Sequence, residues 1–134
     1  MIRSIVCDGH ELEFKHIKFS DGSSNFKLLV EPEFVIKNYY SISVDPSTPG
    51  DVVLWEIMVV TDALQVFTLY GCKKYLTLSY LPHARADRRF ETGNSFPLSV
   101  FVSAINFLSF DEIFLNDAHS YYFSDCSMTP ITEC

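Results

Sequence analysis

The sequence lacks a long apolar run, a close pair of cysteines and an excess of positive charge. No apolar stretch reaches the roughly 18 residues that a membrane-spanning helix needs, so we expect no membrane partner. None of the four cysteines forms a CxxC pair, which argues against a zinc site and favours free thiols in a reducing cytoplasm. Ten Lys and Arg residues stand against 17 Asp and Glu residues, so the formal net charge is -7. This acidic balance argues against nucleic acid as a partner.

The composition is that of a folded protein with one domain. Of the 134 residues, 48% are hydrophobic and 20% are charged, which is enough apolar material for a core without disulfide staples. The first residues offer only a short apolar stretch and make a poor signal peptide. We therefore expect residues 1–134 to form a single cytoplasmic domain.

The order of patterned segments predicts an α/β fold with a parallel sheet flanked by helices. Short apolar or β-rich runs alternate with longer segments of helical spacing, and Gly71 and Pro97 are placed like a helix end and a helix start. The expected elements are strands at 39–44, 75–81 and 112–117 and helices at 51–71 and 97–110. Alternating strands and helices are typical of a parallel sheet. We expect the strands at 75–81 and 112–117 to be neighbours.

The first part of the chain is less periodic and contains one clear hairpin signal. The segment "SDGSS" at 20–24 has turn chemistry, and it lies between the strand-like runs "HIKF" and "NFKLLV". We therefore expect an amino-terminal hairpin ahead of the parallel sheet.

Polar clusters follow two of the predicted strands, at the edge of a parallel sheet where ligands usually bind. After the strand at 75–81 come Arg85, Arg88 and Arg89, whose planar cations suit phosphate oxygens. After the strand at 112–117 come Asp117 and His119, which suit a hard metal ion or its water ligands. Cations and Mg²⁺ around a polyphosphate are the usual means of phosphoryl or pyrophosphoryl transfer.

Plainer interpretations of the same residues stay open. An Arg/Asp cluster in a loop is commonly a solvated ion-pair network, and a single histidine after a strand is commonly structural. On this view His10, His16 and His83 are satisfied structural histidines or exposed ones. Phe19 and Tyr80 fit a core position better than a stacking platform.

Several motifs together resemble one enzyme family. They are "KFSDGSSNFKL" (18–28), "HARADR" (83–88), "TGNSFP" (92–97) and "DAHS" (117–120). The chain between about residues 17 and 120 looks like the ribose-phosphate diphosphokinases, the phosphoribosyl pyrophosphate synthetases. The match is densest over 75–120 and resembles a divergent branch of the kind that viruses of bacteria carry. The resemblance implies a phosphoribosyltransferase-like (type I) domain that corresponds to the amino-terminal, ATP-binding half of those enzymes.

The resemblance implies a role for each residue that matches a family motif. Arg85 and Arg88 would lie against the ATP phosphates, and Asp87 would orient their loop. Phe19 and Asp21 would reach the adenine of an ATP bound to a neighbouring subunit, which implies a homo-oligomer.

The resemblance also implies a metal-dependent reaction. His119 would be the Mg²⁺-linked catalytic histidine, with Asp117 beside it. In that family ATP donates its β,γ-pyrophosphate to the anomeric hydroxyl of ribose 5-phosphate, with Mg²⁺.

The sequence departs from the family at several places. Ala86 stands where the family loop has Gln, and Ser23 stands where its adenine segment has Glu. The five glycines are all isolated, so the glycine-rich loop of the family's ribose-phosphate domain has no counterpart, and we expect that second domain to be absent or to come from a partner polypeptide. Alternatives are pyrophosphoryl transfer to ADP-ribose, a non-catalytic regulatory or assembly subunit, and a plain structural α/β domain.

Overall fold

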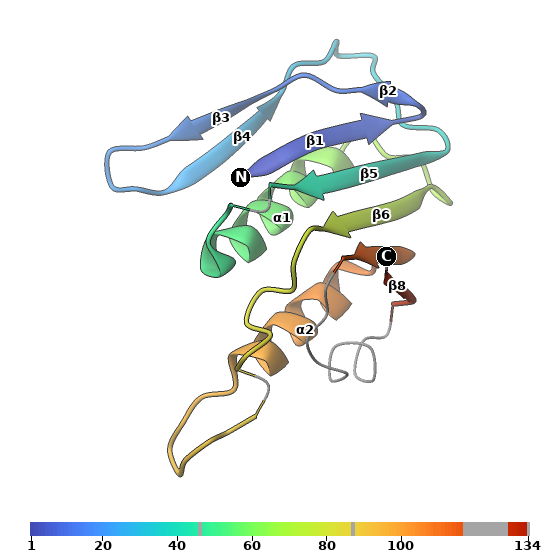
Figure 1. The fold of residues 1–134 in the computed structure, drawn as a ribbon. Helices are drawn as coiled ribbons and strands as arrows, with labels where there is room; N and C mark the ends of the chain where they lie inside the picture. Colours follow the sequence, from blue (N-terminus) through green and yellow to red (C-terminus); the bar gives the residue numbers. More distant parts are fainter. Residues whose placement is uncertain (46, 87, 117–128, 134) are drawn as a thin grey trace.

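The computed structural model describes residues 1–45, 47–86, 88–116 and 129–133. These described residues form one six-stranded sheet, a separate two-stranded hairpin and two helices (Figure 1). The strands are β1 (Ile2–Cys7), β2 (His10–Glu11), β3 (Phe14–Lys18), β4 (Ser24–Leu28), β5 (Tyr39–Val44), β6 (Lys73–Leu78), β7 (Glu112–Leu115) and β8 (Ile131–Glu133), and the helices are α1 (Gly50–Gln65) and α2 (Pro97–Leu108).

The large sheet is mostly parallel, as the sequence predicts. Its strand order is β2-β1-β5-β6-β7-β8, and the pairs from β5 to β8 are all parallel. The predicted neighbours are confirmed, because Tyr75 pairs with Glu112 and Leu78 pairs with Leu115. The strand expected at 75–81 begins two residues earlier and ends at Leu78, beyond which the chain leaves the sheet.

Both helices cover the same face of the sheet. The crossovers β5-α1-β6 and β6-α2-β7 run in the same direction across the sheet, and the two helices contact each other. Burial alternates along β5, where Tyr40, Ile42 and Val44 face the helices and are buried. In Figure 1, α1 runs behind β1 and β5. No helix in the described part of the chain is both long and apolar enough to cross a membrane.

The first helix is shorter than the sequence predicts. The prediction that this helix continues until just before Gly71 is wrong, because α1 ends at Gln65. Just beyond it the N–H of Phe67 and the hydroxyl of Thr68 both bond to the carbonyl of Leu64, which closes the last turn. Gly71 lies instead in a tight turn closed by the N–H of Cys72 and the carbonyl of Leu69, and its φ of +89° explains why glycine occupies that position.

The predicted hairpin is confirmed as β3 and β4. The two strands pair antiparallel from Phe14 opposite Leu28 to Lys18 opposite Ser24. Phe26 and Leu28 bury one face of the hairpin, and β4 packs against α1. Trp55 of α1 adds a hydrogen bond between the helix and the hairpin, because its indole N–H donates to the carbonyl of Ser24 at 3.3 Å.

Three strands are not predicted by the sequence: β1, β2 and β8. A turn at Asp8 and Gly9, both with positive φ, joins β1 to β2. The carboxylate of Asp8 also accepts the backbone N–H groups of Lys37, Asn38 and Tyr39, and these bonds lower its pKa. Asp8 therefore ties the antiparallel edge of the sheet to the start of β5.

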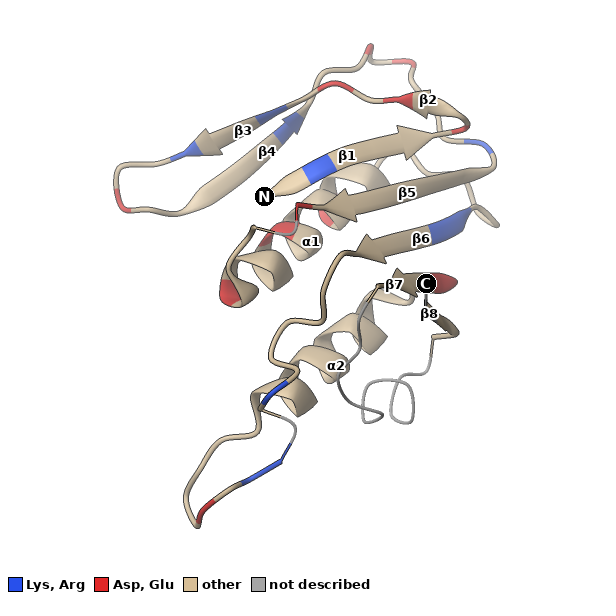
Figure 2. Ribbon diagram, viewed as in Figure 1, with Lys and Arg blue, Asp and Glu red and all other residues tan. Residues whose placement is uncertain are grey.

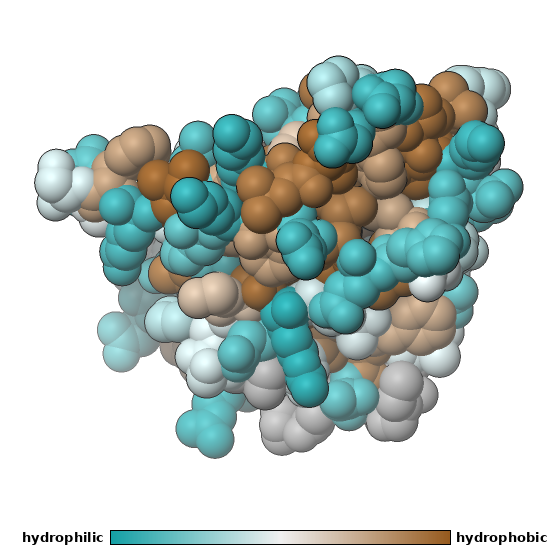
Figure 3. All heavy atoms as spheres, turned by 90° about the horizontal axis from the view of Figure 1, so that it is seen from above, coloured by the Kyte–Doolittle hydropathy of each residue, from teal (hydrophilic) through white to brown (hydrophobic). Residues whose placement is uncertain are grey.

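The antiparallel edge is irregular, and the face seen from above carries an apolar patch bordered by hydrophilic side chains (Figure 3). The register of β1 against β5 shifts between Ile2 and Ser4, which places a bulge at the exposed Arg3. Seen from above, hydrophilic side chains surround and interrupt the apolar surface of the molecule (Figure 3).

Candidate functional site

The carboxyl ends of the central strands form one edge, as the sequence predicts. The N–H of Asn116, directly after β7, bonds to the carbonyl of Leu78 at the end of β6 at 3.3 Å. The described ends of these two strands, up to Asn116, therefore lie side by side. Asp87, Asp117 and His119 lie outside the described residues, so their proposed places in the site stay predictions.

The basic cluster lies on a long projection that we call the arginine arm, residues 82–86 and 88–96. The arm extends away from the sheet just before α2, with basic residues along it (Figures 1 and 2). Arg85 and Arg88 are exposed, and the Arg88 guanidinium lies 5.1 Å from the centroid of the Phe90 ring. Arg89 donates to the carbonyl of Asn94 at 2.6 Å, which holds the arm to itself. Arg85 and Arg88 are placed to meet a ligand from solvent.

The base of the arm is fixed to both helices. Nε2 of His83 lies 3.2 Å from Oδ1 of Asp51, in the first turn of α1. Ala86 donates its N–H to the carbonyl of His83 and accepts the N–H of Leu98 in the first turn of α2. These bonds place Arg85 between two fixed neighbours, although its side chain is exposed.

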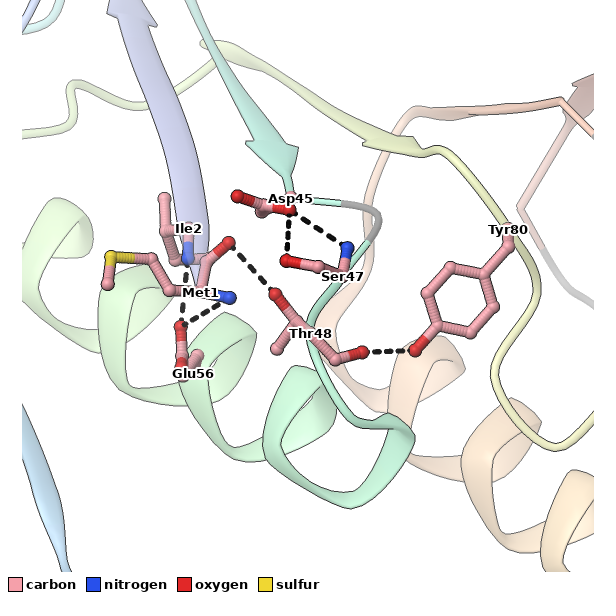
Figure 4. A network of polar contacts seen from close by, with 7 residues as sticks. All are labelled: Met1, Ile2, Asp45, Ser47, Thr48, Glu56 and Tyr80. Atoms are coloured by element: carbon pink, nitrogen blue, oxygen red, sulfur yellow. Dashed lines mark hydrogen bonds and ion pairs between the residues drawn. The ribbon is translucent and has the colours of Figure 1, made fainter.

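A polar network holds the loop after β5 against the base of the arm (Figure 4). The hydroxyl of Tyr80 donates to the carbonyl of Thr48, and partial burial raises the pKa of Tyr80, which keeps the hydroxyl protonated. Oδ1 of Asp45 accepts both the hydroxyl and the N–H of Ser47, at 2.7 and 2.8 Å, and these bonds lower the pKa of Asp45. The loop is therefore braced before it enters α1.

Two cavities meet at Asp51. One, of about 340 Å³, lies between Asp51, His83 and Phe101. The other, of about 330 Å³, lies between Asp51, Trp55 and the hairpin residues 22–24. The start of α1 thus joins the base of the arm to the hairpin turn.

The structure places Phe19 and Asp21 on the exposed hairpin turn. Asp21 accepts the hydroxyl and the N–H of Ser23 at 2.6 and 2.9 Å, which lowers the pKa of Asp21. Phe19 is 51% exposed, so the interpretation of this residue as core is wrong. The hairpin of β3 and β4 and the arginine arm form separate projections (Figure 1), so one copy of the chain does not bring the hairpin turn next to the tip of the arm.

The edge favours anionic ligands by its backbone as well as its side chains. Both helices begin here without a side-chain cap, although the N–H of Leu98 in α2 is already bonded to the carbonyl of Ala86. The positive end of a helix dipole attracts phosphate and carboxylate groups. Within the described ranges, no three His, Cys, Asp or Glu side chains gather to hold a metal ion. The arrangement can therefore bind a polyanion through Arg85, Arg88 and the helix starts.

The sequence does not predict the pairs His83–Asp51 and Tyr80–Thr48. A signal for both was present, because neighbouring parallel strands bring the segments after β5 and β6 to one edge. The expectation for His16 is only partly right: its ring stacks on Phe26, but its buried Nε2 has no partner among the described residues.

No protein-family model and no curated protein matches the sequence. Among solved structures, the chain is similar to phosphoribosylpyrophosphate synthetase from Mycobacterium smegmatis, with a TM-score of 0.71 and 16% sequence identity. The similarity covers 94% of this chain and 41% of that chain. The chain therefore has a phosphoribosyl pyrophosphate synthetase-like phosphoribosyltransferase fold. At this identity the similarity defines the fold alone.

Proposed function

We propose that the chain is the ATP-binding half of a ribose-phosphate diphosphokinase-like enzyme. In the proposed reaction the anomeric oxygen of ribose 5-phosphate bonds to the β-phosphorus of ATP, and the bond between the α,β-bridging oxygen and that phosphorus breaks to release AMP. Arg85 and Arg88 bind the phosphates of Mg-ATP, and Asp87 orients their loop. A partner polypeptide or a further domain binds the sugar phosphate.

One observation carries this proposal: the arginine arm leaves the sheet beside the end of β7. The N–H of Asn116 bonds to the carbonyl of Leu78, so the described ends of β6 and β7 lie at the edge from which the arm leaves. We propose that Asp117 and His119, which follow Asn116 in the sequence, share this edge with the phosphate-binding cations. The fold similarity supports the same assignment, because the solved protein is named for phosphoribosylpyrophosphate synthesis.

Binding of Mg-ATP tests the role of the arm. A charge-assisted hydrogen bond contributes roughly 1.5–3 kcal/mol, so Arg85→Ala should weaken Mg-ATP binding about tenfold or more. Arg85 is exposed, so the thermal midpoint of unfolding should barely change. Lys73→Ala is the matched control, because it removes one exposed positive charge at the opposite end of β6. Equal calorimetric affinities of wild type and Arg85→Ala for Mg-ATP would contradict the proposal and favour a solvated ion-pair network in the arm.

Turnover tests the reaction and the metal assignment. AMP formation from ATP and ribose 5-phosphate with Mg²⁺ should require the part that binds the sugar phosphate, and His119→Ala should then abolish most of it. Asp117 and His119 are the proposed Mg²⁺-linked pair. If ADP-ribose is converted and ribose 5-phosphate is not, the acceptor in the proposed reaction is ADP-ribose, and the proposed ATP site is unchanged. Unimpaired AMP formation by His119→Ala would contradict its catalytic role.

A further inference from the structure

The arginine arm turns away from the sheet at His83, whose backbone conformation is strained. The φ of His83 is +63°, in the left-handed region that residues other than glycine rarely adopt. The N–H of Ala84 donates to the carbonyl of Leu81 at 3.3 Å, and the N–H of Ala86 donates to the carbonyl of His83 at 2.9 Å, so two turns overlap at His83. A strained conformation persists only where the surrounding structure fixes it, and such conformations are concentrated at functional sites.

The ring of His83 connects this strained position to both helices. Its side chain is only 27% exposed and lines the cavity of about 340 Å³ between the starts of α1 and α2. The centroid of the ring lies 6.4 Å from that of Phe101 in α2, and Nε2 lies 3.2 Å from Oδ1 of Asp51 in α1. A Cβ atom at Gly50 would lie 3.5 Å from the same nitrogen, so the backbone at the start of α1 passes close to the ring. The ring thus fixes the direction in which the arm leaves the sheet.

The same cavity lies between the two limbs of the arm. His83 lines it where the arm begins, and Ser95 lines it where the arm returns to α2. Arg85 follows His83 by two residues, and its side chain is exposed. An exposed side chain on a flexible segment must be ordered before it can bind a ligand, and this ordering costs free energy. Fixing the base of the arm removes part of that cost before the ligand arrives.

We propose that His83 is a positioning residue that holds Arg85 in place for the phosphates of Mg-ATP, with Asp51 as its partner. This inference rests on the proposed function, because it assumes that Arg85 binds those phosphates. The backbone of His83 sets the direction of the arm, and its ring holds that direction against α1 and α2. Loss of the ring therefore weakens Mg-ATP binding without removing a phosphate contact.

A double-mutant cycle tests whether His83 acts through Arg85. His83→Asn removes the ring, while Asn tolerates the positive φ at this position. In calorimetric titrations of the full chain, His83→Asn should bind Mg-ATP about fivefold more weakly than wild type. In the Arg85→Ala background the same substitution should weaken binding by less than about twofold, because the group that His83 positions is already missing. A purely structural role predicts the same factor in both backgrounds.

Asp51 provides a second test that does not depend on how well His83→Asn folds. The side chain of Asp51 is 92% exposed, so its replacement should leave the fold intact. Asp51→Ala should weaken Mg-ATP binding about threefold, the effect of losing an exposed contact. Asp51→Asn keeps an oxygen that can accept from Nε2 of His83 and should bind within about 1.5-fold of wild type.

The two Asp51 variants separate the contact from the charge, because both remove the same carboxylate. Charge alone predicts that both bind the ATP anion more tightly than wild type does. Asp62→Asn, which removes an exposed carboxylate near the other end of α1, is the matched control and should leave binding unchanged.

Three results would overturn the proposal: wild-type affinity of His83→Asn, the same loss of affinity from His83→Asn in both backgrounds, or equal affinities of Asp51→Ala and Asp51→Asn. Failure of the proposed function is a different result, because Arg85→Ala alone would then bind Mg-ATP as tightly as wild type. In that case the role of His83 is contradicted together with the ATP site.

Discussion

Glu56 provides a direct test of how the antiparallel edge is attached to the helix layer. This residue of α1 is 2% exposed, and its Oε2 accepts the N–H of Ile2 at 2.8 Å (Figure 4). The amino group of Met1 lies 4.0 Å from the same oxygen. A buried hydrogen bond to a charged acceptor contributes roughly 1.5–3 kcal/mol, and its loss also leaves the N–H of Ile2 without a partner. Glu56→Ala should therefore lower the free energy of unfolding by about 3 kcal/mol.

The comparison with Glu56→Gln separates the hydrogen bond from the charge. The amide oxygen of Gln can still accept the N–H of Ile2, so this variant should lose only about 1 kcal/mol. Urea unfolding, followed by the fluorescence of the single tryptophan Trp55, measures both values. Glu33→Ala, at an exposed position, should stay within about 0.5 kcal/mol of wild type. A loss below about 1 kcal/mol for Glu56→Ala, or equal losses for the Gln and Ala variants, would refute the reasoning.

Two further predictions concern the amino-terminal strands. Bonds from Lys37 and its neighbours lower the pKa of Asp8 from 3.8, so the stability this carboxylate provides is complete above the ordinary pKa and is lost as the pH falls through the lowered one. Asp8→Asn should make the urea midpoint of unfolding depend less on pH across the acidic range. The same pH dependence of the midpoint in the variant and the wild type would contradict this prediction. His16→Phe should raise the free energy of unfolding by about 1 kcal/mol, because it keeps the stack on Phe26 and removes the unpaired Nε2. A lower free energy of unfolding for His16→Phe would show that Nε2 is satisfied in solution.

The elements that the sequence predicts best are those defined by an apolar run or by a strong turn. The apolar run around Leu76 and Leu78 identifies the central strand, because both residues are buried against the helices. The residues 20–24 identify the hairpin by turn chemistry alone. The end of α1 is missed because Thr68 and Leu69 continue the helical spacing, while contacts of Ile36 with Phe67 and Leu69, which are distant in sequence, draw the chain out of the helix.

The sequence predicts the parts of the candidate site that depend on where strands end. It does not predict the parts that depend on contacts between individual side chains. The neighbouring ends of β6 and β7 follow from the strand pattern, and so does the place of the arginine arm. Besides the neighbouring ends of β5 and β6, the pair His83–Asp51 requires the φ of +63° at His83, which one sequence does not reveal. The cavity of about 510 Å³ that Tyr40 helps to line exists because α1 ends at Gln65. It could not be predicted from the sequence, which favours a helix that continues until just before Gly71.

The edges of the sheet have a consequence for solubility. A sheet edge with unpaired N–H and carbonyl groups is a template on which other chains can add strands and aggregate. Among the described residues, the sheet finishes with two residues in β2 on one side and three in β8 on the other. The bulge at the charged Arg3 distorts the part of β1 that β2 leaves uncovered. Copies of this chain are thus poorly suited to join by extending the six-stranded sheet.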